Sequence, residues 1–540
     1  MDTDYNELSI KLFSSFFKSI APQQADSASL LMSKTINAWQ MGHTFIRLND
    51  EEMCIARELS PLVEEGVAAP LVLEDNCLFI GKVWAMEKDC AHYLSKFGKI
   101  DLKIDDENLH KQLQYYFPNQ DDKEQYQASF NTLKHRFSLI TGGPGTGKTT
   151  TVAKILALLC QLDSELPHIA MAAPTGRAAS HLQNSLLKSL THENFPALNE
   201  NIANYLKSLT GKTLHRLLNI NPITLKTKYN EQYYLPYDCI IIDEASMIDL
   251  SMMNKLLRAI SPKTRLILLG DAEQLPSVGS GAVLTQLVSQ ESYLSVSRLI
   301  HSHRFHKDSG IGALAQYIRL GQDNLAIQSF SKFPADLSCI PFDEISLYNQ
   351  LLDLQKDYWQ AIDNNNIEQA LHYFNNSMIL CVYRNDVIRF NRGYRRFLQR
   401  KKFISDEMFC GRAIMVTRNY PSLNIYNGSI GIVMLDNDGK KKVFFAPDHF
   451  LEISRIPEYE DAFALTIHKS QGSEYNEVRL LFPYHTDDKG LFDRMSLYTA
   501  LTRAKKRFIY IGNMQSLQNA IQTQLTRNSG LSLFLPQLMS

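Results

Sequence analysis

Thr141-Gly142-Gly143-Pro144-Gly145-Thr146-Gly147-Lys148-Thr149-Thr150 contains the phosphate-binding pattern G-x-x-x-x-G-K-[ST], which runs from Gly142 to Thr149. The apolar residues 137–140 precede it as a predicted strand, and residues 152–159 follow it with helical spacing. In such a loop the glycines let consecutive backbone N–H groups turn toward one anion, and the helix N-terminus adds partial positive charge. The alternative, a glycine turn beside a chance Lys-Thr pair, is disfavoured by the flanking strand and helix. We therefore predict a nucleoside-triphosphate site at residues 142–150.

The same pattern assigns chemistry to particular side chains. Lys148 would reach the β- and γ-phosphates of ATP, and the Thr149 hydroxyl would be a ligand of Mg²⁺. Downstream, the apolar strand 239–242 delivers Asp243 and Glu244 at its carboxyl end, the edge at which α/β sheets bind ligands. Asp243 would hold the Mg²⁺, and Glu244 would polarise the attacking water. An acidic turn after a strand is common by itself, but the upstream phosphate loop favours the catalytic interpretation.

Four more side chains are candidates for the nucleotide site. Gln274 follows the apolar strand predicted at 266–270, where it could sense the γ-phosphate. Arg304 and Arg503 are cations placed to reach the nucleotide, the second as an arginine finger across a domain cleft. Gln125, on a predicted helix before the phosphate loop, is a candidate adenine contact, although a lone Gln on a helix is more often solvated.

The composition limits the class of protein. The chain has 540 residues, enough for three or four domains, with the 44% hydrophobic and 21% charged content of an ordinary globular protein. Because the formal net charge is −1, a nucleic-acid site must be a local basic channel. The eight cysteines contain no C-x-x-C pair, which argues against zinc or iron–sulfur sites and favours reduced thiols in a cytoplasm. The chain start does not resemble a signal peptide, and no apolar stretch approaches the roughly 18 residues of a membrane span. We therefore expect a cytoplasmic protein without membrane contact.

Four segments lie outside the predicted nucleotide site. Residues 1–112 look like a separate module without a catalytic constellation, with a hairpin at 71–80. Residues 220–236 alternate apolar and polar side chains around Asn-Glu-Gln, which predicts a short two-stranded excursion. Residues 389–402 carry seven basic residues with Phe and Tyr between them, a pattern typical of a phosphate-and-stacking surface or of a solvated amphipathic helix. Short strands and Asn-Gly and Asp-Gly turns in 411–453 predict a small all-β barrel inserted into an α/β unit.

Nine ordered motifs over about residues 125–510 carry a resemblance to a known family. They are GGPGTGKTT, APTGRAA, TLHRLL, DEASMID, LGDAEQLPSVGSG, SHRF, NGSIGIV, TIHKSQGSE and YTALTRAKK. In this order they are similar to the motifs of superfamily 1B helicases, and among these the chain resembles the RecD family of RecBCD-type enzymes.

The resemblance implies a fold as well as an activity. It is an α/β architecture with two RecA-like P-loop NTPase domains in tandem, an SH3-like β-barrel inserted in the second, and a small α+β N-terminal domain. The implied boundaries are 1–112 for the N-terminal partner-docking domain, 113–335 for the first RecA-like domain with a β-hairpin at about 220–236, 336–405 and 457–540 for the second, and 406–456 for the barrel.

The activity implied by the resemblance is ATP-dependent 5′–3′ movement on single-stranded DNA. The implied partners are RecB-like and RecC-like subunits in a complex that acts on duplex DNA ends in recombinational repair and DNA degradation. Carried onto this sequence, the family motifs place five residues at the DNA: Pro174, Thr175, His215, Thr466 and His468. They add six residues to the nucleotide site: Gln125, Gln274, Arg304, Gly472, Glu474 and Arg503.

Two other functions stay open at this point. One is a stand-alone translocase of the same superfamily, on DNA or RNA. The other is a subunit that binds ATP without hydrolysing it and only clamps or signals, which is disfavoured because the hydrolytic set is intact: Lys148, Asp243, Glu244, Gln274 and Arg503. No nuclease constellation is visible, so we expect any nuclease activity to reside in a partner subunit.

Overall fold

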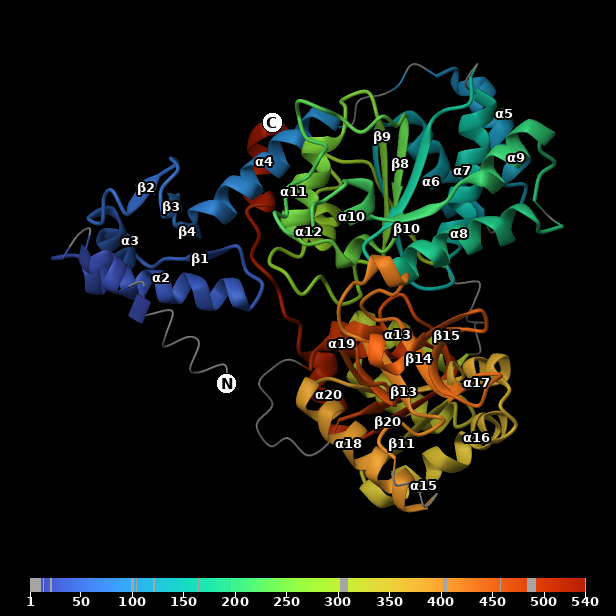
Figure 1. Cartoon of the computed structure of the whole chain (residues 1–540). Helices are drawn as coiled ribbons and strands as arrows, with labels where there is room; N and C mark the ends of the chain where they lie inside the picture. Colours follow the sequence, from blue (N-terminus) through green and yellow to red (C-terminus); the bar gives the residue numbers. More distant parts are fainter. Residues whose placement is uncertain are drawn as a thin grey trace. The chain divides into compact units, whose positions relative to one another are not determined.

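Figure 1 shows the computed structural model, which describes residues 11–12, 14–19, 22–98, 102, 104–119, 122–162, 165–193, 195–301, 309–401, 406–456, 458–482 and 492–539. The chain divides into two compact units. The first unit comprises Met1–Ala272, Pro276–His301 and Thr526–Ser540, and the second comprises Glu273–Leu275 and Ser302–Leu525.

The first unit is built around a six-stranded parallel sheet in the order β10-β5-β9-β8-β6-β7. Its strands are β5 Phe137–Gly142, β6 Ile169–Ala173, β7 Gly211–Thr213, β8 Cys239–Ile242, β9 Arg265–Gly270 and β10 Val296–Leu299. Parallel neighbours need crossover connections, which here are mostly helices. The helices around this sheet are α6 Lys123–Lys134, α7 Lys148–Leu162, α8 Gly176–Leu190, α9 Glu200–Ser208, α10 Leu214–Leu217, α11 Leu250–Ala259 and α12 Val283–Ser289.

Both faces of this sheet are buried, which explains the continuous apolar runs of its strands. Successive side chains of a strand point to opposite faces. Ile241 therefore lies in the apolar cluster that contains α7, whereas Ile240 and Ile242 lie in the cluster that contains α11. The strands predicted at 239–242 and 266–270 are confirmed.

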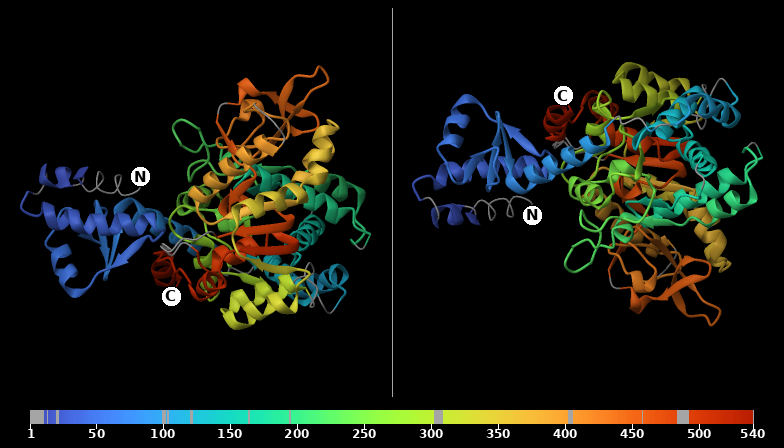
Figure 2. Two further views of the ribbon diagram at one scale, coloured as in Figure 1. Left: turned by 90° about the horizontal axis from the view of Figure 1, so that it is seen from below. Right: turned by 90° about the horizontal axis from the view of Figure 1, so that it is seen from above.

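The N-terminal part of the first unit carries a second, four-stranded sheet in the order β1-β4-β3-β2. Its elements are α2 Ala25–Gln40, β1 Phe45–Arg47, α3 Asp50–Arg57, β2 Val63–Glu65, β3 Leu71–Glu74 and β4 Cys77–Ile80. α2 lies beside β1 and β4 (Figure 2). The hairpin predicted at 71–80 is confirmed, because β3 and β4 pair antiparallel and Asp75 takes a φ of 53° at the turn.

Two further helices of the N-terminal region share the core of the six-stranded sheet. α4 Gly81–Phe97 packs against α11 and buries Cys90 and Leu94 in the same cluster as Ile240. α5 Asp106–Tyr116 packs against α6 and buries Leu109 in the cluster that contains α7. The boundary expected between residues 112 and 113 therefore falls inside a helix.

The end of the chain also packs in the first unit. α21 Leu531–Met539 contacts α4, and the ring of Phe534 stacks on that of Phe79 with centroids 5.9 Å apart. Residues 526–540 were expected from the family pattern in the second RecA-like domain, but they belong to the first unit. The apolar side chains of α21 account for this return, because they complete the cluster beneath α4.

Glu87, on α4, is a buried carboxyl that holds the segment before α21. The Ser529 hydroxyl donates to its two oxygens at 2.9 and 3.2 Å. Burial raises the pKa of Glu87 from 4.5 to about 7, although hydrogen bonds from Ser529, Thr44 and backbone N–H groups lower it. Because the folded pKa lies above the ordinary value, the stabilising contribution of this carboxyl is complete below pH 4.5 and is lost as the pH rises through 7.

We expect Glu87→Gln to remove this part of the pH dependence of stability. Between pH 5 and pH 8 the wild-type chain should lose about 2–3 kcal/mol of unfolding free energy through Glu87, and the variant, whose amide cannot titrate, should lose none of it. Urea unfolding of both proteins at the two pH values, followed by tryptophan fluorescence, measures the difference. The exposed Glu58→Gln serves as a control and should behave as wild type. An identical pH dependence in all three proteins would contradict a protonated Glu87.

The second unit contains a five-stranded parallel sheet in the order β11-β20-β19-β12-β18. Its strands are β11 Leu337–Ile340, β12 Ser377–Cys381, β18 Ala464–Thr466, β19 Tyr475–Leu481 and β20 Ala504–Ile511. The helices of this unit are α13 Gly310–Leu320, α14 Asp323–Lys332, α15 Glu344–Leu354, α16 Lys356–Asp363, α17 Ile367–Phe374, α18 Arg384–Lys401, α19 Arg494–Leu501 and α20 Met514–Gln522. Residues 309–335, with α13 and α14, were expected in the first RecA-like domain, but they belong to this unit. Among the described residues of the whole chain, no helix has both the length and the apolarity needed to span a membrane.

An antiparallel sheet is inserted in the second unit between α18 and β18, in the order β16-β15-β14-β13-β17. Its strands are β13 Ala413–Val416, β14 Ile430–Leu435, β15 Lys441–Ala446, β16 His449–Glu452 and β17 Tyr459–Asp461. Gly428 and Gly439 take φ values of 88° and 76° in the two predicted turns. The insert has an apolar core of its own. The short strands predicted within 411–453 are confirmed.

The segment 220–236 differs from the two strands predicted there, because it contains only isolated bridges. Asn221 Oδ1 accepts the backbone N–H of Ile223 at 2.9 Å, and Asn230 Oδ1 accepts that of Gln232 at 2.9 Å. Side-chain bonds to nearby backbone compete with a strand ladder. The segment is therefore a pair of local turns rather than a hairpin of two strands.

Candidate active site

The predicted phosphate loop connects β5 to α7 in the first unit. Two of its glycines are required by their surroundings. A Cβ atom on Gly142 would lie 2.6 Å from the carbonyl oxygen of Leu299. One on Gly147, whose φ is 83°, would lie 2.5 Å from Gln125 Nε2. A larger residue at position 142 would collide with the backbone of Leu299, and one at position 147 would have to adopt a left-handed φ and displace Gln125.

Lys148 lies over the loop itself. Its Nζ donates to the carbonyl oxygens of Gly142 at 2.6 Å and of Gly143 at 3.0 Å, and the Thr146 hydroxyl donates to the same Gly143 oxygen at 2.9 Å. The ammonium group is thus held where the pattern predicts phosphate, outside the apolar core. Four further residues of the predicted site are half-buried or exposed: Pro144, Gly145, Thr149 and Thr150.

Asp243 and Glu244 directly follow β8, as predicted. Asp243 is 8% exposed, and its Oδ1 accepts the Glu244 backbone N–H at 2.8 Å. Glu244 has a φ of 54°, a left-handed value that is uncommon for a non-glycine residue and clusters at functional sites. Burial raises the pKa of Asp243, whereas the Glu244 N–H and the charge of Lys148 lower it. The carboxylates and the phosphate loop therefore lie in one electrostatic environment.

Gln274 and Arg503, which were predicted separately, are bonded to each other in the second unit. Arg503 Nη2 donates to Gln274 Oε1 at 2.7 Å, and the guanidinium also donates to the carbonyls of Thr499 at 3.2 Å and Ser473 at 3.3 Å. The next residue, Leu275, donates its N–H to Thr499 Oγ1 at 2.8 Å. Arg503 is 3% exposed, so these bonds fix its side chain.

Gly472 and Glu474 flank Ser473, whose carbonyl accepts the bond from Arg503. Gly472 has a φ of 72°, and Glu474 forms an ion pair with Lys505 at 3.2 Å. The structure thus gathers Gln274, Gly472, Glu474 and Arg503 in one region of the second unit. Arg304 lies outside the described residues.

In the first unit, the residues predicted to contact DNA follow two neighbouring strands, at the same edge of the sheet. β6 and β7 pair in parallel, with Ala173 opposite Thr213. Thr175 follows β6 and accepts the Ala178 N–H at 3.2 Å, which caps α8. His215 follows β7 on α10, where burial and the charge of Lys255 lower the pKa of its imidazole.

Two DNA candidates belong to the second unit. Thr466 ends β18, and its hydroxyl oxygen accepts the Lys469 N–H at 3.3 Å. His468 begins a short 3₁₀ turn, His468–Ser470. Pro174, in the first unit, immediately follows β6. All five predicted DNA contacts therefore lie just beyond parallel strands or at their ends, the edge at which ligands bind in this class of sheet.

Comparison with known proteins adds a family to this geometry. Two family descriptions match the chain, an AAA domain at residues 125–280 and a UvrD-like helicase C-terminal domain at residues 461–510. The RecBCD enzyme subunit RecD of Mycolicibacterium smegmatis is 36% identical, with 76% of this chain and 74% of that protein covered. The RecBCD enzyme subunit RecD of Haemophilus influenzae is 34% identical, with 87% of this chain and 82% of that protein covered. The chain belongs to the RecD family.

The resemblance expected from the nine motifs is confirmed by these matches. The ATP-dependent RecD2 DNA helicase of Deinococcus radiodurans is more distant from this RecD-family chain, at 27% identity over 74% of the chain and 50% of that protein.

The donor set of this RecD-family chain fits Mg²⁺ bound together with phosphate. Among the described residues, no group of three or more His, Cys, Asp and Glu side chains is arranged to hold a metal by itself. Mg²⁺ usually keeps several waters and binds one or two carboxylates plus substrate phosphates. Asp243, buried near the charge of Lys148, and Thr149, in the first turn of α7, are oxygen donors of the kind such a site needs.

Two contacts of the RecD-family site were not predicted in this form. Gln125, on α6, is 6% exposed, and its Nε2 donates to the Thr146 carbonyl at 3.4 Å, so it contacts the phosphate loop. Glu124 Oε2 accepts the backbone N–H groups of Ile300 at 2.6 Å and His301 at 3.1 Å, which ties α6 to the end of β10. Glu124 and His301 are 177 residues apart in the sequence, and no local pattern connects them.

Proposed function

We propose that this RecD-family chain is an ATP-dependent 5′–3′ DNA helicase, one motor of a RecBCD-type helicase–nuclease that acts on duplex DNA ends. The observation that carries the proposal is the hydrolytic set of the first unit, in which Lys148 lies on the phosphate loop and Asp243 and Glu244 follow β8. A subunit that only clamped on ATP would need no water-orienting carboxylate such as Glu244. The sequence of the RecD relatives supports the partnership with RecB- and RecC-type subunits.

In the proposed reaction ATP is the substrate and its phosphates bind at residues 142–150. Lys148 neutralises charge on the β- and γ-phosphates, and Glu244 orients the attacking water and accepts its proton. Thr149 and Asp243 would hold Mg²⁺, which neutralises the phosphate charge that develops during transfer. We assign five residues to recognition of the nucleotide and response to its γ-phosphate: Gln274, Arg304, Gly472, Glu474 and Arg503.

We further propose that each parallel sheet is the core of a RecA-like domain, the first at about 113–301 and the second at about 302–405 and 457–525. The antiparallel insert at 406–456 is proposed to be the SH3-like barrel of the family. The single-stranded DNA would contact the sheet edges at Pro174, Thr175 and His215 in the first unit and at Thr466 and His468 in the second. With its lowered pKa, His215 would act as a neutral hydrogen-bonding group rather than as a cation.

Docking to the partner subunits is assigned to the N-terminal region, which contains no catalytic group. Among the described residues of this region, six large apolar side chains are exposed: Leu12, Phe16, Leu30, Trp39, Met41 and Val67. Exposed apolar side chains of this size favour a protein interface when they lie together. Leu30, Trp39 and Met41 belong to α2 or the residue after it, and Leu12 and Phe16 precede α2.

The aromatic pair at the tip of segment 220–236 is proposed to separate the DNA strands. The rings of Tyr229 and Tyr233 stack with centroids 5.3 Å apart, and Lys228 Nζ lies 5.5 and 5.7 Å from the two centroids. Glu231 and Arg258 form two hydrogen bonds, at 2.5 and 3.0 Å, which hold the tip to α11. Tyr233 is 55% exposed and could therefore stack on a base pair.

We expect the double variant Tyr229→Ala/Tyr233→Ala to unwind duplex DNA about tenfold more slowly, since each base–aromatic contact is worth about 1–3 kcal/mol. Hydrolysis of ATP stimulated by single-stranded DNA should stay within about twofold of wild type, because the ion pair with Arg258 is untouched. Strand separation and hydrolysis are measured on the same preparations. Tyr234→Ala, outside the stacked pair, is the control. Parallel loss of both activities, or of neither, would contradict the role in strand separation.

The proposed function is tested by unwinding assays with the co-expressed RecB- and RecC-type subunits of the source organism. To isolate this motor, the ATP-binding lysine of the RecB-type subunit is inactivated. We expect ATP-dependent unwinding of a duplex with a 5′ single-stranded tail and none with a 3′ tail. Unwinding from the 3′ tail would reverse the proposed direction. Equal unwinding by this chain alone would favour the stand-alone translocase instead.

A further inference from the structure

α18 presents a row of arginines on its exposed face. Phe390 and Tyr394 are 3% and 0% exposed and Phe397 is half-buried, so none of the described residues of 389–402 offers an exposed ring for a stacking surface, and the amphipathic helix is confirmed. The exposed face carries Arg389, Arg392 and Arg396. These positions are three and four residues apart, so they lie on one side of the helix over about 10 Å of its length.

The three arginines line an open pocket between α18 and the start of α15, together with Glu344, Asn385, Ile388 and Gly393. Gly393 allows the close approach of α15, because a Cβ there would lie 2.0 Å from the Tyr348 hydroxyl oxygen. That hydroxyl donates to Glu344 Oε1 at 2.8 Å. Within the part of the chain that the structure describes, none of the three arginines forms an ion pair or a side-chain hydrogen bond. Glu344 is the one carboxylate among the residues that line this pocket, so the three arginines outnumber the acidic side chains there.

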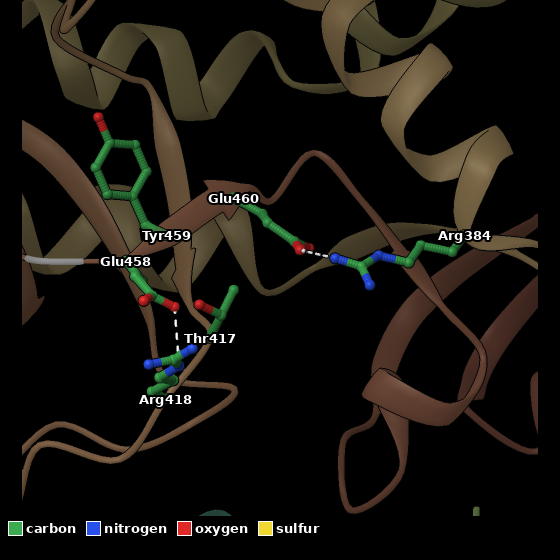
Figure 3. Close-up of a pocket in the computed structure, with 6 residues that line it drawn as sticks. All are labelled: Arg384, Thr417, Arg418, Glu458, Tyr459 and Glu460. Atoms are coloured by element: carbon green, nitrogen blue, oxygen red, sulfur yellow. Dashed lines mark hydrogen bonds and ion pairs between the residues drawn. The ribbon is translucent and has the colours of Figure 1, made fainter. Parts of the chain in front are cut away.

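A second pocket of the same unit shows the opposite arrangement (Figure 3). Arg384 and Arg418 line it, but Arg384 pairs with Glu460 at 2.9 Å and Arg418 pairs with Glu458 at 3.0 Å. Each arginine there already has its own carboxylate. Arginines without a bonded carboxylate are thus a feature of the α18 pocket and not of every arginine in this unit. The second pocket supplies a matched control.

Apolar side chains beside the arginines indicate which kind of anion fits. Ile388, in the pocket, is 42% exposed, and Ile345, next to Glu344, is 69% exposed. Arginine together with apolar side chains is typical of protein–protein interfaces. A nucleic-acid backbone would leave these isoleucines without an apolar partner. No exposed aromatic ring of α18 is available to stack on a base.

We propose that the arginine face of α18, formed by Arg389, Arg392 and Arg396, docks an acidic protein segment that carries an apolar residue among its carboxylates. Guanidinium groups form paired hydrogen bonds with carboxylates, and the apolar residue would pack on Ile388. We make this assignment on the basis of the proposed function, in which RecB- and RecC-type subunits are the partners. The segment belongs to one of them, and the face is a second attachment besides the N-terminal region.

The test compares two charge-reversal variants of the full chain. Arg392→Glu/Arg396→Glu changes the proposed surface, and Arg384→Glu/Arg418→Glu changes the compensated pocket, where the arginine side chains are 72% and 70% exposed. Affinity for the co-expressed RecB- and RecC-type subunits is measured by surface plasmon resonance at low and high salt. At low salt we expect about tenfold weaker binding for the first variant and less than about twofold change for the second. High salt should weaken wild type more than the first variant.

Two further readouts separate the possible failures. Binding of a fluorescent oligothymidylate and DNA-stimulated ATP hydrolysis should be unchanged in both variants. Equal affinity of both variants for the subunits would overturn the docking surface. Selective loss of oligothymidylate binding in the first variant would overturn it in favour of a nucleic-acid site. Failure of the wild-type chain to bind either subunit would overturn the proposed partnership and the docking surface together, while DNA-stimulated hydrolysis would still test the motor.

Discussion

Lys148→Ala is expected to reduce ATP hydrolysis by at least about 100-fold while leaving the chain folded. Among the described residues, the ammonium bonds to the carbonyls of Gly142 and Gly143, which belong to the loop, so its loss removes no core contact. It does remove the positive charge that the phosphate loop needs during phosphoryl transfer. A second effect adds to the first, because the charge of Lys148 lowers the pKa of Asp243 and its removal makes that carboxylate easier to protonate.

Steady-state hydrolysis in the presence of single-stranded DNA measures this effect, with circular dichroism and thermal unfolding to verify the fold. Lys188→Ala, at an exposed position near the end of α8, is the matched control in the same unit and should hydrolyse ATP as wild type does. A folded Lys148→Ala chain with turnover near wild type would show that the loop is not the site of hydrolysis.

Glu244→Gln is expected to separate ATP binding from ATP hydrolysis. The amide keeps the size of the side chain, and the backbone N–H of residue 244 still donates to Asp243. The amide cannot orient the attacking water as a carboxylate does, and it cannot accept a proton from that water. Turnover should therefore fall by about 10²–10⁴-fold. ATP affinity should stay within about threefold of wild type, because we assign the Glu244 side chain to the attacking water and not to a phosphate or to Mg²⁺.

Equilibrium binding of a fluorescent ATP analogue with Mg²⁺ and single-turnover hydrolysis give the two quantities separately. Asp243→Asn is the informative partner variant, because it should weaken the Mg²⁺ dependence of binding as well as turnover. If Asp243→Asn bound the nucleotide normally and Glu244→Gln did not, the two carboxylates would have exchanged roles.

The parts of the fold that the sequence predicted correctly have local signals. The phosphate loop and the Asp243-Glu244 pair each follow an apolar strand within a few residues, and the hairpin at 71–80 has its turn residues between two β-rich runs. The alternation of apolar and polar residues also predicted two strands in segment 220–236. That prediction was wrong, because side-chain hydrogen bonds of Asn221 and Asn230 produce local turns there.

The contacts that the sequence could not reveal join residues far apart in the chain. Arg503 and Gln274 are separated by 229 residues, and Ser529 and Glu87 by 442. The return of the chain end to the first unit depends on apolar contacts between α21 and α4. The apolar pattern of a helix shows which face is buried but not which other helix covers that face. The family motifs predicted that Gln274 and Arg503 belong to one nucleotide site, but only the structure shows the hydrogen bond between them.

Hydrolysis of ATP by the purified wild-type chain, measured with and without oligothymidylate, tests the central claim most directly. A motor driven along DNA must couple the occupancy of its DNA site to turnover at the phosphate loop. We predict slow hydrolysis without DNA and a rise of at least about tenfold when single-stranded DNA is added, dependent on Mg²⁺. A folded chain that binds ATP and the oligonucleotide yet hydrolyses no ATP, with or without DNA, would contradict the account.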